Sequence, residues 1–225
     1  MFAEIIPLLS KALGETIYMV VVSMAIASAI GVPLGVLLHT TAKGQILENI
    51  FINQTIGSVV NAVRSIPFII LMVAIIPLTR FIVGSAIGTT AAIVPLVIAS
   101  IPFIGRQVET SLKEVPSGLV EAALAMGATP FQIISKVLLP EAMPGIVSQL
   151  TTVIIALVGE SAMAGAIGGG GLGDLAIRYG YQRSDPKSCW RRSSYLSSWF
   201  SSFNLSATPL QKNWTNADEK RGRHG

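Results

Sequence analysis

Residues 117–140 read SGLVEAALAMGATPFQIISKVLLP and carry the most specific local signal in the chain. This stretch predicts two short helices joined by a turn. Ser117 is the expected cap of the first helix, whose apolar residues recur at helical spacing. Gly127 marks the turn, because a residue without a Cβ readily takes a positive φ. Thr129 and Gln132 have the spacing of a capping box, which predicts where the second helix begins.

The same stretch resembles a known motif. Its spacing of Glu-Ala-Ala, a glycine and Val-Leu-Leu-Pro is similar to that of the EAA loop of ABC importer permeases. The family pattern has isoleucine at the position of Val137. In that family the loop forms a coupling helix that docks into a groove of the ATP-binding subunit. The resemblance therefore implies an ATPase-coupling loop that contains Glu121, Ala122, Ala123, Gly127, Val137, Leu139 and Pro140.

Composition independently points to a membrane protein. The chain has 225 residues, of which 51% are hydrophobic and only 12% charged, and its mean hydropathy is +0.64. Soluble domains carry about a quarter charged residues. A net charge of +4 without a basic, aromatic-lined face argues against nucleic acid as a partner. One cysteine and two histidines exclude a disulfide framework and make a metal cofactor unexpected.

Four apolar segments are long enough to cross a hydrocarbon core of about 30 Å. They lie at about residues 17–38, 58–78, 81–104 and 146–168, after an N-terminal interfacial segment at 1–16. The expected fold is therefore an all-α polytopic membrane protein, which the resemblance narrows to the transmembrane domain of a type I ABC importer. No nucleophile–base pair or P-loop is present, so we expect a transport component rather than an enzyme.

Prolines and glycines are expected to divide these segments. The glycine-containing stretch 84–89 predicts a turn before the third helix, which Pro95 and Pro102 are expected to interrupt. Pro140 and Pro144 are expected to end the helices that precede them.

The loop at 105–145, which carries the EAA pattern, is expected in the cytoplasm. Lysine and arginine are enriched in cytoplasmic loops. The residues assigned to that side are Lys43, Arg64, Arg106, Lys113 and Lys136, against Lys11 and Arg80 outside.

Glu160 is the only carboxylate well inside a predicted span. Ionisable groups are costly there and mark functional sites by default. Two interpretations stay open. In the first, Glu160 lines the translocation path; in the second, it accepts hydrogen bonds from Gln149, Thr151 or Thr152, or faces a water-filled vestibule.

The residues after Glu160 are small or flexible. Ser161 and Met163 are further candidates for a gate, although methionine in an apolar helix is more often simple packing. Ser161 and Gly165 are spaced so that helices can approach closely. The glycine cluster at 165–173 formally contains Gly-x-Gly-x-x-Gly, but it follows a helix and not a strand, so we expect a tight turn and no nucleotide site.

Residues 1–183 are similar to methionine-importer permeases of Gram-negative bacteria, most clearly in the segment VGESAMAGAIGGGGLGDLAIRYGYQR. This resemblance implies a multi-pass homodimer of five-span subunits in the bacterial inner membrane. It also implies two ATP-binding subunits that hold ATP and Mg²⁺, and an external or lipoprotein methionine-binding protein. The implied substrate is D- or L-methionine.

The tail at 184–225 does not fit this pattern. It is serine-rich and basic, and it lacks the run of about 18 apolar residues that a fifth span needs. Reading the codons from Ser188 one frame over yields aliphatic residues if the arginines use CGN codons. We favour a frameshift; the alternative is a genuine polar extension.

Other functions remain open at this point. The chain is alternatively a permease for another small amino acid or related solute, or a truncated product without activity. A secondary transporter would work without an ATPase, and a membrane anchor would carry no substrate.

Overall fold

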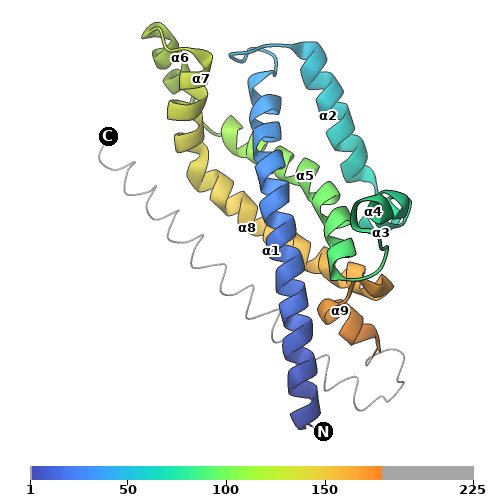
Figure 1. Ribbon diagram of the computed structural model, residues 1–225. Helices are drawn as coiled ribbons and strands as arrows, with labels where there is room; N and C mark the ends of the chain where they lie inside the picture. The colour runs from blue at the N-terminus through green and yellow to red at the C-terminus, as the bar shows by residue number, and fades with distance from the viewer. Residues whose placement is uncertain (1, 179–225) are drawn as a thin grey trace. The chain divides into compact units, whose positions relative to one another are not determined.

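The computed structural model describes residues 2–178, and their side chains from residue 6 onward. Regular structure in that range is entirely helical (Figure 1). Within that range the helices form two compact units: one joins residues 2–22, 72–96 and 154–178, and the other joins Ser23–Leu71 and Val97–Val153. The expected frameshifted tail at 184–225 lies outside the described residues.

Helix α1 is continuous from Phe2 to Thr40. The segment expected to be separate at 1–16 is thus continuous with the helix of the first predicted span. Ile6–Thr40 is apolar enough to cross a membrane over 35 residues. A helix of that length extends about 50 Å, so one end projects beyond a hydrocarbon core of about 30 Å.

The expected single helix at 58–78 is instead broken near its middle. Helix α2, Ile50–Ser65, ends before Ile66, which is extended with φ −83° and ψ 123°. The ring of Pro67 disfavours helical geometry in the residue before it. Helix α3, Phe68–Ala74, continues at an angle of 101° to α2, and α4 covers Ile76–Val83.

Helix α5, Thr89–Lys113, begins after the turn predicted at 84–89, where Gly84 and Gly88 have φ of 81° and 112°. It runs through Pro95 and Pro102 without interruption, contrary to expectation, because a membrane helix tolerates lost backbone hydrogen bonds when neighbours compensate. It also takes in residues 105–113, which were expected in the loop.

In the second unit α1 and α5 pack with their backbones in close approach. A Cβ on Gly35 would lie 2.6 Å from the carbonyl oxygen of Gly105 and 2.6 Å from the Cβ of Val108. A Cβ on Gly31 would lie 2.8 Å from Ile104. The glycines of α1 therefore allow α5 to pack at this distance.

Within the described residues, the C-terminal half consists of one long helix and five short helical segments. They are α6 (Ser117–Ala125), α7 (Pro130–Ile133), the π-helical turn η1 (Ile134–Leu138), α8 (Leu139–Ala164), the turn η2 (Gly165–Gly169) and α9 (Gly171–Ala176). The prediction that Pro140 and Pro144 end helices is wrong, since both lie within α8. The wider turn η1, in which the Leu139 N–H donates to the Ile134 carbonyl, leads directly into α8.

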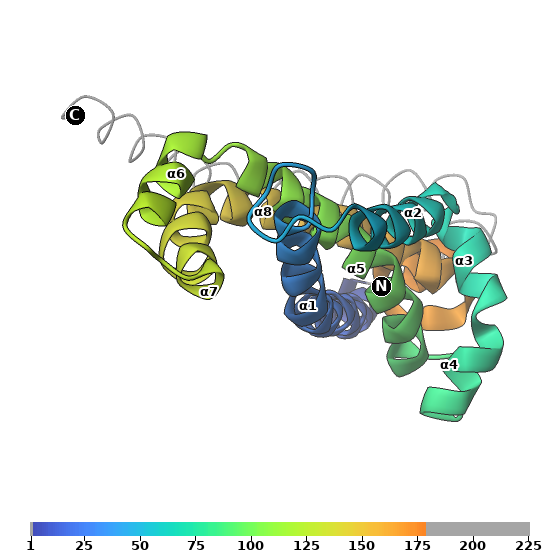
Figure 2. The same ribbon diagram turned by 90° about the horizontal axis from the view of Figure 1, so that it is seen from above.

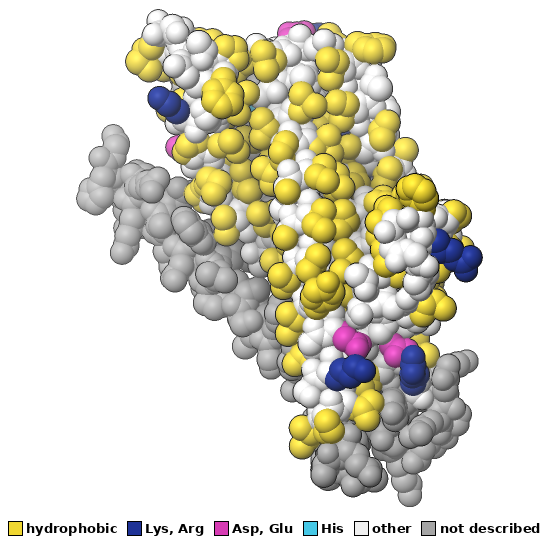
Figure 3. All heavy atoms as spheres, in the orientation of Figure 1, with side chains coloured by type: hydrophobic (Ala, Val, Ile, Leu, Met, Phe, Trp, Pro, Cys, Tyr) yellow, Lys and Arg dark blue, Asp and Glu magenta, His cyan; other side chains and the backbone are white. Residues whose placement is uncertain are grey.

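The surface matches a lipid environment. Three described helices are long and apolar enough to span a membrane, or four if the bent α2–α3 pair is one span. Large apolar side chains are exposed, among them Phe51 (80%), Phe81 (89%) and Ile87 (70%). Figure 3 shows hydrophobic side chains over most of the visible face of α1, with charges near its N-terminal end. The expected all-α polytopic fold is therefore observed.

Candidate functional site

The turn between α6 and α7 has the geometry predicted for Gly127. Its φ is +77°, the N–H of Ala128 donates to the Ala123 carbonyl at 3.1 Å, and its own N–H donates to the Leu124 carbonyl at 2.9 Å. This pair of bonds is the Schellman motif that ends helices at a left-handed residue. A Cβ on Gly127 would meet no atom within 4 Å, so the backbone conformation alone requires glycine here.

The second helix begins with the predicted capping box. The N–H of Gln132 donates to Thr129 Oγ1 at 3.4 Å, and the N–H of Thr129 donates to Gln132 Oε1 at 2.9 Å. The expected cap at Ser117 is wrong. Pro116 occupies the cap position in an extended conformation, and Ser117 is the first helical residue without a capping bond.

Helices α6 and α7 pack together as a hairpin, seen end-on in Figure 2. The side chains buried in this hairpin region are Ala123, Ile133 and Leu138, with 4%, 0% and 2% exposed. Large apolar side chains are exposed on it, and we call them the apolar face: Leu119, Leu124, Met126 and Phe131. The hairpin thus has an internal core and a separate hydrophobic surface.

The residues of the EAA pattern divide between these two environments. Glu121, Ala122, Gly127 and Pro140 are exposed, Val137 and Leu139 are half-buried, and Ala123 is buried. Ala123 therefore contributes to the interior of the hairpin. The pattern does not itself include the residues of the apolar face; large apolar residues on both sides of a predicted turn were the available signal.

The second unit also contains a charged network that the sequence analysis missed. Glu109 is 5% exposed and lies between two cations of α5, with Arg106 Nη1 at 2.6 Å and Lys113 Nζ at 2.7 Å. Arg106 Nη2 also donates to Asn61 Oδ1 of α2 at 3.0 Å. In the sequence, Arg106 and Lys113 contribute only to the positive charge expected of a cytoplasmic loop. Their spacing with Glu109, three and four residues apart, was a usable signal of one helix face.

In the first unit, the three residues proposed for a path or gate differ in exposure. Glu160 is half-buried, and no described residue bonds to its carboxyl group. Ser161 is 2% exposed and donates to the Val158 carbonyl at 2.8 Å, whereas Met163 is 51% exposed. The hydroxyl of Thr151, one of the expected partners of Glu160, donates within its own helix to the Val147 carbonyl at 3.0 Å.

The glycine cluster forms the expected tight turn in the first unit. Gly168, Gly170 and Gly171 have φ of 94°, 79° and 74°. The turn is bonded to neighbouring segments, since the N–H of Gly88 donates to the Gly168 carbonyl at 3.0 Å. Close packing of small residues is also present: a Cβ on Gly173 would collide with the backbone of Ala162.

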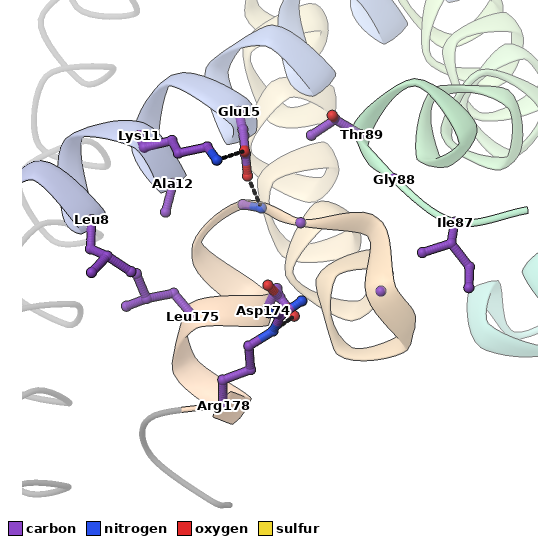
Figure 4. A pocket seen from close by; sticks show the side chains of 13 residues that line it. Leu8, Lys11, Ala12, Glu15, Ile87, Gly88, Thr89, Asp174, Leu175 and Arg178 are labelled. Atoms are coloured by element: carbon purple, nitrogen blue, oxygen red, sulfur yellow. Dashed lines mark hydrogen bonds and ion pairs between the residues drawn. The ribbon is translucent and has the colours of Figure 1, made fainter. Parts of the chain in front are cut away.

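A cavity of about 410 Å³ opens beside this turn (Figure 4). Lys11 and Glu15 of α1 line it, their charged atoms 3.9 Å apart, together with Asp174 of α9 and Arg178 beyond it, paired at 2.7 Å. Apolar side chains of Leu8 and Leu175 complete part of its wall. Among the described residues there is no group of three His, Cys, Asp or Glu side chains that could hold a metal ion.

Comparison with known proteins defines the class of the chain. Residues 31–200 match the family model of the binding-protein-dependent transport system inner membrane component. The chain belongs to this family, which makes it an inner-membrane transport component and not an enzyme, as expected from the EAA pattern.

The relatives are permeases of one kind. Over 178 residues the chain is 60% identical to the probable D-methionine transport system permease protein MetI of Vibrio cholerae, covering 79% of each chain. It is 55% identical over 158 residues to the D-methionine transport system permease protein MetI of Escherichia coli K12, covering 70% of this chain and 73% of the relative.

Solved structures agree with this assignment. An inward-facing structure of the MetNI methionine ABC transporter superposes with a TM-score of 0.89 at 45% identity, covering 95% of this chain and 99% of that one. A second inward-facing crystal form has a TM-score of 0.87 at 46% identity, with 92% and 96% covered. An amino acid ABC transporter at 19% identity and a TM-score of 0.75 shares the fold.

Proposed function

We propose that the chain is the permease subunit of an ATP-driven importer of methionine. In this proposal it acts as a homodimer with two copies of an ATP-binding subunit and with an external methionine-binding protein. The observation that carries the proposal is 60% identity to a D-methionine permease, together with the fold shared with a methionine ABC transporter at a TM-score of 0.89.

The apolar face is the proposed contact for the ATP-binding subunit. Met126 and Phe131 are 81% and 78% exposed, and together they offer a hydrophobic surface on both sides of the Gly127 turn. Burial of apolar area stabilises a complex by roughly 25 cal/mol per Å². The buried Ala123 keeps the hairpin in the shape that presents this surface.

The path from the hairpin to the membrane interior runs along one continuous stretch of helix. Helix α7, the turn η1 and helix α8 follow one another without a break from Pro130 to Ala164. A displacement of the hairpin by ATP binding is thereby passed along α8 to Glu160. We retain Glu160 and Met163 as candidates for the translocation path, and place Ser161 in helix packing because its side chain is buried.

Uptake of radiolabelled methionine into proteoliposomes tests the function. The chain is reconstituted with its ATP-binding subunit, and the methionine-binding protein and each labelled enantiomer are supplied outside. We expect uptake that requires internal ATP, and competition by unlabelled methionine but not by leucine or glutamine. Glu160→Gln is expected to lower the uptake rate while the complex still assembles, if Glu160 lines the path.

Each alternative has its own outcome in this assay. Uptake by the chain without the ATP-binding subunit would indicate a secondary transporter. Stronger competition by another amino acid would indicate a different substrate. Absence of flux with all partners present would indicate a membrane anchor or a truncated product without activity. Unchanged uptake by the Glu160→Gln variant would remove that residue from the path.

A further inference from the structure

The first two N–H groups of α9 are bonded by side chains of α1. The N–H of Gly171 donates to Glu15 Oε2 at 2.8 Å, and the N–H of Leu172 donates to Thr16 Oγ1 at 2.9 Å. Figure 4 shows the Glu15 carboxylate directed at the start of α9. A helix normally receives such bonds from its own cap residue, but Gly170 has no side chain to supply one.

The contact is possible only because glycines face α1. A Cβ on Gly170 would lie 2.9 Å from Glu15 Oε2, and a Cβ on Gly171 would lie 2.6 Å from Thr16 Oγ1. Thr16 is 4% exposed, and its hydroxyl donates to the Ala12 carbonyl at 3.0 Å while it accepts from Leu172. The bond to Ala12 therefore orients the Thr16 hydroxyl so that a lone pair of its oxygen faces α9.

On its other side α9 packs against the end of the helix that carries Glu160. A Cβ on Gly165 would lie 2.5 Å from the Asp174 nitrogen, and a Cβ on Gly173 would collide with Ala162. Helix α9 is thus held between the N-terminal half of α1 and the end of α8, within one compact unit.

We propose that Glu15 and Thr16 are positioning residues for transport, and we call this pair the α1 latch. The latch supplies the caps of α9 from a different helix and keeps the glycine turn in place. The N-terminal half of α1 and the end of α8 therefore move together. When α8 is displaced during the transport cycle, the latch carries that displacement to α1. This role in transport rests on the function proposed above, whereas the capping contact does not depend on it.

The experiment uses matched pairs of variants in the full chain. Glu15→Ala removes the acceptor, whereas Glu15→Gln keeps an acceptor oxygen without the charge. Thr16→Val removes the hydroxyl at nearly constant shape, and Thr16→Ser keeps it. Lys11→Ala is the control for the neighbouring ion pair, because the Lys11 side chain is 80% exposed and its nitrogen is 3.9 Å from Glu15.

Two readouts separate the latch from its use in transport. The first is amide hydrogen exchange of the peptide containing Gly171 and Leu172 in the lipid-reconstituted chain. The second is the methionine taken up per ATP hydrolysed by the complete transporter. Loss of a hydrogen bond to a charged acceptor raises the equilibrium constant for local opening by roughly tenfold or more. Glu15→Ala is therefore expected to raise the amide exchange rate by about that factor.

In transport, we expect Glu15→Ala and Thr16→Val to lower the maximal uptake about fivefold to tenfold, with the KM changed less than about twofold and ATP hydrolysis retained. Glu15→Gln, Thr16→Ser and Lys11→Ala should stay within about twofold of the unmodified chain. The conservative variants distinguish a positioning role from a general loss of stability.

Unchanged exchange in both Glu15→Ala and Thr16→Val would overturn the latch. Raised exchange with unchanged uptake per ATP would overturn its role in transport, as would a loss of uptake in Glu15→Gln equal to that in Glu15→Ala. If the transporter does not assemble with the Glu15→Ala variant, the Thr16→Val and Thr16→Ser variants test the proposal by the same measurements. If the unmodified chain imports no methionine with its partners, the proposed function and with it the transport role fail, and the exchange experiment still decides the capping contact.

Discussion

The guanidinium of Arg106 donates to Asn61 Oδ1 at 3.0 Å and so joins α5 to α2. The same guanidinium also donates to the buried carboxylate of Glu109, which accepts a second hydrogen bond from the Lys113 ammonium. Two of these contacts lie on one face of α5, but the third reaches across to another helix. The network therefore fixes how α2 stands against α5 within the second unit.

Replacing Arg106 should destabilise the second unit. Arg106→Ala leaves the buried Glu109 with Lys113 alone and removes the bond to Asn61. Breaking a buried ion pair costs about 3–5 kcal/mol, and we expect about 2–3 kcal/mol because the Arg106 side chain is 25% exposed. Thermal unfolding in detergent measures the loss. Arg80→Ala is the control, since Arg80 is exposed and outside the network; an equal effect of both variants would contradict the role of Arg106.

Substitutions at Gly127 should uncouple ATP hydrolysis from transport. A residue with a side chain is strained at φ +77° by about 1–2 kcal/mol, which disturbs the turn between α6 and α7. We expect Gly127→Leu to lower uptake per ATP, and Gly127→Asn to do so less, because asparagine tolerates this conformation. Gly118→Ala is the matched control, since its Cβ would meet no atom within 4 Å and it lies within α6. Normal transport by Gly127→Leu would refute the coupling role.

The apolar face and the buried Ala123 predict different failures. Met126→Asp and Phe131→Asp should leave the permease stable but weaken its association with the ATP-binding subunit by roughly tenfold or more, because each large apolar side chain contributes about 1.5–3 kcal/mol when buried. Ala123→Asp should instead unfold the hairpin, since it places a charge in an apolar interior. Co-purification and thermal unfolding, measured on the same variants, separate the two effects. Full association in the Met126→Asp and Phe131→Asp variants would exclude this surface as the contact.

The packing of α1 on α5 should be sensitive to a single methyl group. Gly35→Ala places a Cβ 2.6 Å from the Gly105 carbonyl oxygen, and such overpacking costs about 1–3 kcal/mol. Gly14→Ala lies in the same helix with open space around its Cβ, so it should be neutral or stabilising by about 0.5–1 kcal/mol. Melting temperatures of the two variants provide the test. A stable Gly35→Ala protein would show that α1 and α5 can separate without penalty.

Local signals in the sequence predicted local structure well. The turn at Gly127 and the capping box at Thr129 depend on the dihedral preferences and side-chain bonds of a few adjacent residues, and both are observed. The bend before Pro67 was equally present in the sequence as a residue–proline pair, but the apolar composition of 58–78 favoured one straight span. Pro140 failed as a stop signal because the wider turn η1 leads into a helix that contains it.

Which of these residues face inward, and which elements contact each other, depends on how the helices pack. An all-α membrane protein, the position of the α6–α7 hairpin and the glycine turn after Glu160 could be predicted from the sequence alone, since composition, periodicity and backbone preference are properties of short segments. The sequence could not place Ala123 in an interior, join Arg106 to Asn61 or bring Glu15 to Gly171. Those contacts link residues far apart in the chain, and they form only when helices pack closely enough for one to supply the hydrogen-bonding groups that another lacks.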